Sequence, residues 1–137
     1  METKIFKFES EKSIREIISE IRTKSEKFGF VIRYDFNMGE VFEEHGVTVD
    51  DDFKFHSIQL CIPNKAYNSI KENSDRVTLI MPKNIVVYKD KISNKTIISY
   101  FSIGDDLLLK ILPGDDKILN SLPKSSEIIL ELINLVK

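Results

Sequence analysis

The sequence lacks tryptophan and has a single cysteine, Cys61, with only five glycines and four prolines in 137 residues. One cysteine cannot form an internal disulfide, a pattern typical of proteins from reducing compartments. The scattered glycines form no phosphate-binding loop, and the sequence contains no G-x-S-x-G elbow and no paired-carboxylate motif. These absences argue against a nucleotide-dependent enzyme and against the common hydrolases.

Long hydrophobic runs are also absent. No segment approaches the ~20 continuous apolar residues that a membrane span needs, and the charged N-terminal segment does not resemble a signal peptide. A formal net charge of −2 provides no general attraction for phosphate backbones. We therefore expect a cytoplasmic protein with neither a membrane nor a nucleic acid as its partner.

The sequence does contain enough apolar material for one domain spanning residues 1–137. Its apolar fraction is 42% and its charged fraction is 31%, both typical of a folded protein. Strand and helix patterns mix without regular alternation, which predicts an α+β fold with a largely antiparallel sheet. The predicted strands lie near 6–8, 30–36, 53–62, 77–81, 85–89 and 96–103, with short helices at 38–45 and after Asn64 and a helical segment at 105–137.

The clearest helix has an apolar face at three- and four-residue spacing, formed by Ile14, Ile17, Ile18, Ile21 and Phe28. Ser13 and Glu16 fit a capping box, with Ser10 as the alternative cap, and Gly29 is placed to end the helix. This helix is interpreted as structural, because its other side carries ordinary charged residues.

The helical segment at the C-terminus is expected to break at Pro113-Gly114 and to resume at Pro123, since proline is favoured in the first turn of a helix. The last helix has an apolar face formed by Ile128, Ile129, Leu132, Ile133, Leu135 and Val136. That face is wider than packing on one sheet requires. The helix could therefore pack within its own subunit or against a partner.

Three short motifs carry a resemblance to a known family: Gly29-Phe30-Val31, C-I-P-N-K-A from Cys61 to Ala66, and L-I-M-P-K-N-I-V-V-Y-K from Leu79 to Lys89. From roughly Ser13 to Ile103 the chain resembles the domain-of-unknown-function 302 family. The resemblance implies a fold similar to the TATA-binding-protein-like α+β class, with helices packed on one face of a curved, mostly antiparallel sheet. It also implies homodimers, and it implies no reaction.

One departure from the family pattern concerns thiol chemistry. Many members of the family have a second cysteine where this chain has Lys83. Chemistry that needs two neighbouring thiols within one subunit is therefore not expected.

Cys61 is the first candidate for chemistry. It lies three residues before Asn64, which is expected to cap a short helix, and a thiol near a helix N-terminus can have a lowered pKa. Such a thiolate could act as a nucleophile, a sulfur carrier or a redox sensor. The alternative is a buried apolar filler, which is the commoner role of a free cysteine and the favoured interpretation.

The only histidines, His45 and His56, could gather metal ligands with Glu43, Glu44 and the acidic run 50–52. No pair has a recognised ligand spacing, so we expect solvated surface histidines, no metal site and no cofactor. His56 also falls on the strand face opposite to Cys61, which argues against a Cys-His pair. An aromatic set could line a pocket or form an ordinary core, the latter being favoured: Phe30, Tyr34, Phe36, Phe53 and Phe55.

These observations favour a non-enzymatic, dimeric domain that binds a small ligand or a protein. The candidate cleft is edged by Cys61, Asn64 and a predicted turn formed by Pro82, Lys83 and Asn84. No catalytic residue is assigned. The alternative is a thiol-dependent enzyme, carrier or sensor that uses Cys61. Nucleic-acid binding is suggested only by analogy of fold, and the acidic charge balance counts against it.

Overall fold

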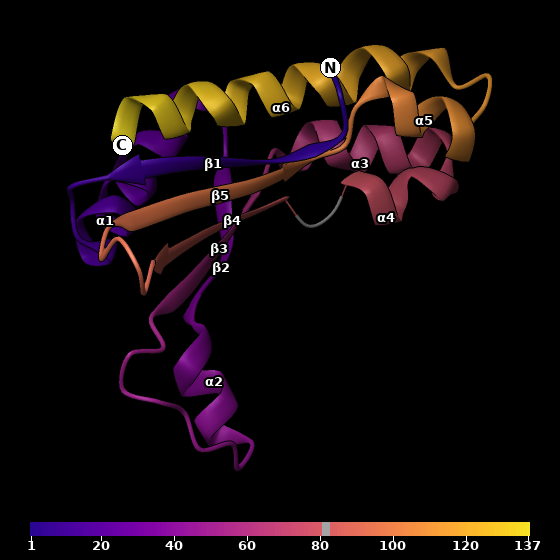
Figure 1. The fold of residues 1–137 in the computed structure, drawn as a ribbon. Helices are drawn as coiled ribbons and strands as arrows, with labels where there is room; N and C mark the ends of the chain where they lie inside the picture. The colour runs from indigo at the N-terminus through magenta and orange to yellow at the C-terminus, as the bar shows by residue number, and fades with distance from the viewer. Residues whose placement is uncertain (81–82) are drawn as a thin grey trace.

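A computed structural model of the chain describes residues 1–80 and 83–137. Five strands form one antiparallel sheet in the order β1-β5-β4-β3-β2 (Figure 1). The strands are β1 (Lys4–Ser10), β2 (Val31–Asn37), β3 (Phe55–Cys61), β4 (Lys83–Lys89) and β5 (Thr96–Ser102). The predicted α+β fold with an antiparallel sheet is confirmed.

Six α-helices accompany the sheet: α1 (Ile14–Lys24), α2 (Met38–Glu44), α3 (Pro63–Glu72), α4 (Val77–Ile80), α5 (Asp105–Ile111) and α6 (Asp116–Val136). The long helix α6 runs across one face of the sheet, while α2 projects on the opposite side (Figure 1). None of the helices in the described ranges is long and apolar enough to cross a membrane.

The main core lies between the sheet and helices α1 and α6. Alternate strand residues point toward these helices and are buried: Ile58, Leu60, Ile85, Val87, Ile98 and Tyr100. They pack with buried helix residues, among them Ile17, Ile21, Ile129, Leu132, Ile133 and Val136. The wide apolar face of α6 is thus largely occupied within its own subunit.

The start and end of the first helix follow the sequence prediction. The Ser13 side chain accepts a hydrogen bond from the Glu16 amide, and the Glu16 side chain accepts one from the Ser13 amide, which completes the capping box. The helix tightens into a 3₁₀ turn at Ser25–Phe28 and ends at Gly29, whose φ of 83° requires the left-handed region. This element is determined locally.

The predicted strand at 77–81 is wrong. Val77–Ile80 forms the short helix α4, which continues directly from a 3₁₀ turn at Ser74–Arg76. A β-branched, apolar run favours a strand by propensity, but the buried side chain of Arg76 ties this segment to a distant part of the chain (described below). Met81 lies outside the described residues.

The predicted turn at Pro82, Lys83 and Asn84 is also wrong where it can be checked. Lys83 and Asn84 form the beginning of β4 and pair with Leu60 and Gln59 of β3. Pro82 lies outside the described residues. Hydrogen bonding to the neighbouring strand therefore decides the conformation of this segment.

Two predicted helix starts are wrong, by two residues for α3 and by seven for α6. Helix α6 begins at Asp116, with Asp115 as its N-cap, and Pro123 lies inside it. The buried face of α6 continues across the proline through Ile118 and Leu122, so packing outweighs the loss of one backbone hydrogen bond. Helix α3 begins at Pro63 after Ile62, and Asn64 lies within its first turn.

Phe30, Ile32, Tyr34 and Phe36 alternate along the sequence, a pattern that predicts one apolar strand face. A register shift in β2 shows that this prediction is wrong. The pairing with β3 shifts between Ile32 and Tyr34. Ile32 stays opposite the buried Leu60, whereas Tyr34 pairs with Gln59 on the other face. A bulge of this kind exchanges the faces of all later residues, and a pattern of alternating residues cannot reveal it.

Candidate functional site

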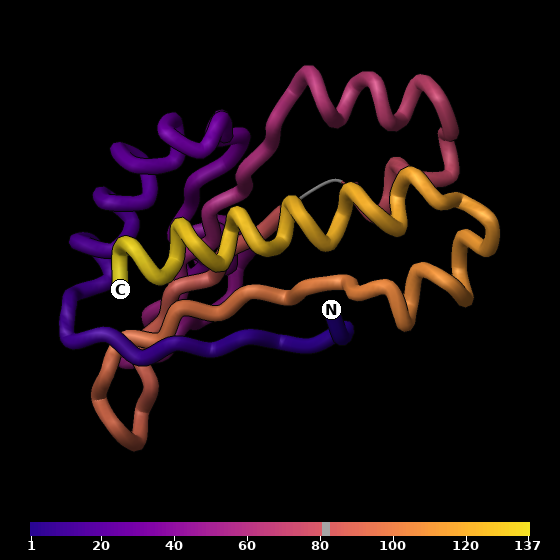
Figure 2. Tube along the Cα trace, turned by 90° about the horizontal axis from the view of Figure 1, so that it is seen from above, coloured from indigo at the N-terminus to yellow at the C-terminus, as the bar shows by residue number. Residues whose placement is uncertain are grey.

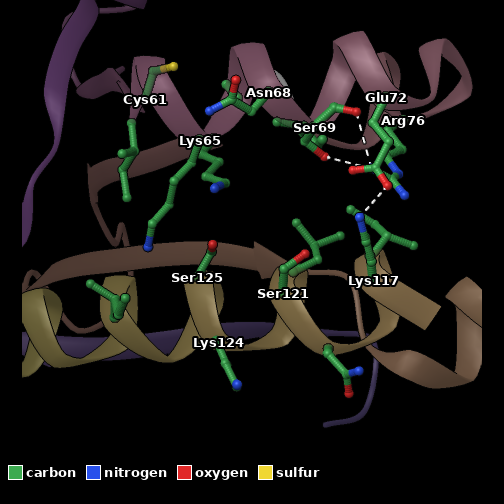
Figure 3. A pocket seen from close by; sticks show the side chains of 18 residues that line it. Cys61, Lys65, Asn68, Ser69, Glu72, Arg76, Lys117, Ser121, Lys124 and Ser125 are labelled. Atoms are coloured by element: carbon green, nitrogen blue, oxygen red, sulfur yellow. Dashed lines mark hydrogen bonds and ion pairs between the residues drawn. The ribbon is translucent and has the colours of Figure 1, made fainter. Parts of the chain in front are cut away.

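A cleft with a volume of about 540 Å³ lies between α3 and α6. The two helices run past each other in opposite directions (Figures 2 and 3). Helix α3 presents Lys65, Asn68, Ser69 and Glu72, and α6 presents Lys117, Ser121, Ser125 and Ile128. Both sets recur at three- or four-residue spacing, which places each set on one helix face. We call this feature the α3–α6 cleft.

The floor of the α3–α6 cleft is apolar. It includes residues of a second buried cluster: Cys61, Ala66, Ile80, Ile118 and Leu122. The Cys61 side chain comes from the end of β3, where the strand passes into α3 through Ile62. An apolar floor below polar helix walls is the usual construction of a small-molecule site.

One end of the cleft is held by a buried ion pair. The Arg76 guanidinium donates two hydrogen bonds to the Asp115 carboxylate, at 2.7 and 2.6 Å, and a third to the Ser69 carbonyl at 3.1 Å. The side chains of Arg76 and Asp115 are only 6% and 9% exposed. The hydrogen bond from Arg76 lowers the pKa of Asp115 despite the opposing effect of burial. The pair therefore remains ionised at neutral pH.

The same end contains a second, more exposed pair. Lys117 of α6 donates to Glu72 of α3 at 2.6 Å and so bridges the two walls of the cleft (Figure 3). The two cations at this end, Arg76 and Lys117, are thus both neutralised by carboxylates.

The opposite end, beside Cys61, carries Lys65 and Lys83. Burial lowers the pKa of Lys83, the neighbouring Lys65 lowers it further, and Cys61 acts in the opposite sense. Within residues 1–80 and 83–137, neither lysine has a carboxylate within ion-pair distance and Lys83 makes no side-chain hydrogen bond. This end therefore has cationic groups that are available to a ligand.

Only two of the four predicted cleft residues come together. Cys61 and Lys83 both line the α3–α6 cleft. Asn64 is not among the described residues that line the cleft. It is exposed on α3 and accepts a hydrogen bond from Asn68 at 3.4 Å. Asn84 instead joins Lys83 in a separate cavity of about 200 Å³ near Leu79 and Phe101.

Sequence reasoning missed the second wall of the cleft entirely. Residues of α6 such as Ser121 and Ser125 lie far from Cys61 in the chain, and no motif links them. One local signal was present: Lys65, Asn68 and Glu72 form a polar stripe along one face of the helix after Cys61.

The histidines lie apart from this cleft. The ring of His45 is exposed, and its Nδ1 atom lies at hydrogen-bond distance, 2.9 Å, from the Val41 carbonyl oxygen. His56 is only 19% exposed and pairs with Asp35, which also accepts a hydrogen bond from Arg22, so the prediction of a solvated surface residue is wrong for His56. Burial raises the pKa of Asp35, but the hydrogen bonds from Arg22 and His56 outweigh it and the pKa is lowered. The described residues contain no group of three or more potential metal ligands.

The predicted aromatic set divides between the two sides of the sheet. Phe30 is buried in the main core. Phe53 and Phe55 instead belong to a row of neighbouring rings on the other side, with ring centroids 4.5 Å apart. Phe42 continues this row beyond Phe53, and Tyr88 stacks on Phe55. The five aromatic residues do not line one pocket.

The family described as "Domain of unknown function DUF302" matches residues 6–121, a wider range than the expected 13–103. The crystal structure of an uncharacterized conserved DUF302 protein from Bacillus stearothermophilus is similar, with a TM-score of 0.78, over 97% of this chain and 98% of that chain. Sequence identity is 17%, so the similarity shows the fold alone. Among curated proteins, none matches this sequence significantly.

Proposed function

This chain belongs to the DUF302 family, and we propose that it is a non-enzymatic, dimeric domain that holds a small ligand in the α3–α6 cleft. The observation that carries the proposal is the cleft itself. Its volume of about 540 Å³ falls within the range of ~300–1,000 Å³ that is usual for small-molecule sites. Its apolar floor and convergent polar walls provide both affinity and orientation. We place this function in the cytoplasm, which agrees with the single cysteine of the chain.

A binding role accounts for the site better than thiol chemistry does. The Cys61 side chain is 6% exposed and packs with Ala66 and Ile80. His56, the histidine of the same strand, points to the opposite face, so it offers no general base to the thiol. Cys61 therefore serves as part of the apolar floor.

We expect native mass spectrometry of the gently purified protein to detect a noncovalent mass that is lost on denaturation. Ser125→Trp, which fills the α3–α6 cleft, should abolish this mass. Glu127→Trp, on an exposed position of the same helix, should retain it. The two variants differ only in whether the added ring enters the cleft.

Two outcomes would count against this function. A protein without bound mass that also binds no member of a fragment library by ligand-observed NMR would contradict it. Covalent mass that survives denaturation and disappears in Cys61→Ser would instead support the thiol-dependent alternative.

The proposed dimer uses the sheet face that points away from α6. Among the described residues, the central strands β3, β4 and β5 present no charged side chain on this face. Several large apolar groups are exposed on it: Ile5 (59%), Val31 (44%), Tyr34 (57%) and Phe101 (54%). Exposed aromatic residues with few charges are characteristic of the core of an interface. Two such faces can stack as aligned sheets ~10 Å apart.

The area of this sheet face is sufficient for a stable dimer interface. Five strands ~4.8 Å apart, with seven residues at ~3.3 Å each, cover roughly 550 Å² per subunit, or about 1,100 Å² in total. That total exceeds the ~1,000 Å² expected of a specific interface. Helix α2 projects on the same side (Figure 1), and its Phe42 continues the stacked row toward Tyr88, so it adds further contact area.

We expect the wild-type protein to sediment as a dimer and Phe101→Glu to sediment as a monomer, because pairing would bury an uncompensated carboxylate. Analytical ultracentrifugation measures the difference, with circular dichroism to verify folding. The matched control is Leu109→Glu, since Leu109 is 56% exposed on α5 and lies outside the sheet. A monomeric wild type, or a dimeric Phe101→Glu variant, would rule out this interface.

A further inference from the structure

The charges around the α3–α6 cleft indicate the class of ligand. Five of the lining side chains are cationic, whereas only Glu72 is anionic, although the chain as a whole has a net charge of −2. The cations are Lys65, Arg76, Lys83, Lys117 and Lys124. A local excess of positive charge in a concave, partly apolar site favours an anionic ligand.

Ion pairs neutralise the positive charge at one end of the cleft but not at the other. Arg76 and Lys117 are neutralised by Asp115 and Glu72 and hold the cleft together at one end. The ammonium group of Lys124 points away from α3, whereas the Lys65 side chain extends from α3 toward α6 (Figure 3). The charge available to a ligand is therefore concentrated at Lys65 and Lys83.

Lys83 occupies the deeper of these two positions. It pairs with Leu60, whose side chain is 1% exposed beneath the helices, so the two side chains share the helix-covered face of the sheet. Burial of an ammonium group is unfavourable unless a partner compensates its charge, and in the described part of the chain no carboxylate does so. An anion at this position would supply the missing partner.

The remainder of the cleft can accommodate an apolar part of a ligand. Ala66, Ile80, Ile118 and Leu122 form a continuous floor from the lysine end toward Arg76. Along α3, the eight residues from Lys65 to Glu72 span ~10 Å at the helical rise of 1.5 Å per residue. A chain of several methylene groups fits this length and gains from burial on the floor.

Building on the proposed function, we propose that the ligand is an amphiphile with an anionic carboxylate or phosphate head and an aliphatic body. The head lies between Lys65 and Lys83 beside Cys61, and the body lies along the apolar floor. A charge-assisted hydrogen bond from each lysine orients the head, while burial of the methylene groups contributes most of the affinity.

Isothermal titration calorimetry with three probes of equal chain length tests this inference: decanoate, decyl phosphate and decanol, all below their aggregation concentrations. We expect at least one anion to bind about tenfold more tightly than decanol, because a charge-assisted hydrogen bond usually contributes about that much to affinity. The preferred anion then distinguishes a carboxylate from a phosphate head.

Variants assign the effect to the two lysines. Lys83→Met should remove the preference for the anion and leave decanol binding unchanged. Lys71→Gln, at an exposed position of α3 outside the cleft lining, should behave as the wild type. Lys65→Gln is the second variant, because Lys65 is exposed and its replacement does not disturb folding. It should weaken binding of the anion alone.

Failure of the proposed ligand class can be distinguished from failure of the proposed binding function. Equal binding of decanol and the anions, or an undiminished preference in both Lys83→Met and Lys65→Gln, would overturn the anionic head and leave the binding function intact. Failure of all three probes to bind would overturn the amphiphile, and the binding function would then depend on the comparison of Ser125→Trp with Glu127→Trp.

Discussion

Replacing Asp115 by alanine is expected to lower the free energy of unfolding by about 4 kcal/mol. Removing one partner of a buried ion pair costs ~3–5 kcal/mol, because the guanidinium of Arg76 remains buried without compensation. Asp115 also accepts a hydrogen bond from the Ile118 amide at 3.3 Å as the N-cap of α6, and loss of a cap costs ~1 kcal/mol. Urea denaturation followed by circular dichroism measures the change.

Three further variants separate the causes. Asp115→Asn keeps a good N-cap residue but removes the charge, so it should still lose about 3 kcal/mol. Asp116→Asn, at the next and exposed position, should change stability by less than ~0.5 kcal/mol. Arg76→Met combined with Asp115→Leu should regain most of the loss, because no buried charge remains. A loss below ~1 kcal/mol in Asp115→Asn would show that the pair is not effectively buried.

The same pair predicts how stability depends on pH. The pKa of Asp115 is lowered in the folded protein by the hydrogen bond from Arg76. Its contribution is therefore complete above the ordinary aspartate pKa of ~3.9 and disappears as the pH falls through the folded-state value. The difference in stability between wild type and Asp115→Asn should accordingly narrow in acid.

Leu132→Ala is expected to lower the free energy of unfolding by about 3 kcal/mol. Leu132 of α6 is fully buried in the main core, so truncation removes buried methyl groups and leaves a cavity. Denaturant unfolding gives the value, and the slope of the transition should stay unchanged.

Leu135→Ala is the matched control for this substitution. Leu135 lies on the same helix three residues later but is 49% exposed, so its truncation should cost less than ~0.5 kcal/mol. A large cost at Leu135 would instead indicate that the outer side of α6 contacts a partner. A small cost at Leu132 would contradict the packing of α6 within its own subunit.

The proposed ligand cleft and the proposed dimer face are separate. The cleft lies between α3 and α6, whereas Tyr34 and Phe101 point to the sheet face away from α6. Substitutions at the two sites are far enough apart to be interpreted independently. A monomeric variant that still binds ligand would therefore be an informative combination.

The sequence was most informative where structure depends on neighbours in the chain. Ser13, Glu16 and Gly29 determine the ends of α1 by short-range hydrogen bonds and backbone conformation, and both ends are confirmed. The predicted strands 53–62 and 96–103 lie within two residues of the observed bounds of β3 and β5. The α+β class follows from the same local patterns.

The sequence predicted only one side of the candidate site, for a physical reason. Cys61 and Lys83 were named from short motifs, and both line the cleft. Their partners come from α6, and Arg76 finds its carboxylate 39 residues away at Asp115. Pairing over that distance depends on how α3 and α6 pack, which no local pattern encodes.

By itself, the sequence determined the fold class, the capped first helix and the absence of familiar catalytic motifs, because these depend on residue type and short-range spacing. Only the tertiary structure decided that Val77–Ile80 is helical, that Pro123 lies within α6 and that the bulge in β2 turns Tyr34 to the open face. In each case local preference, worth ~1 kcal/mol per residue, was outweighed by burial and long-range pairing. The α3–α6 cleft, whose walls meet only after folding, belongs to that second group.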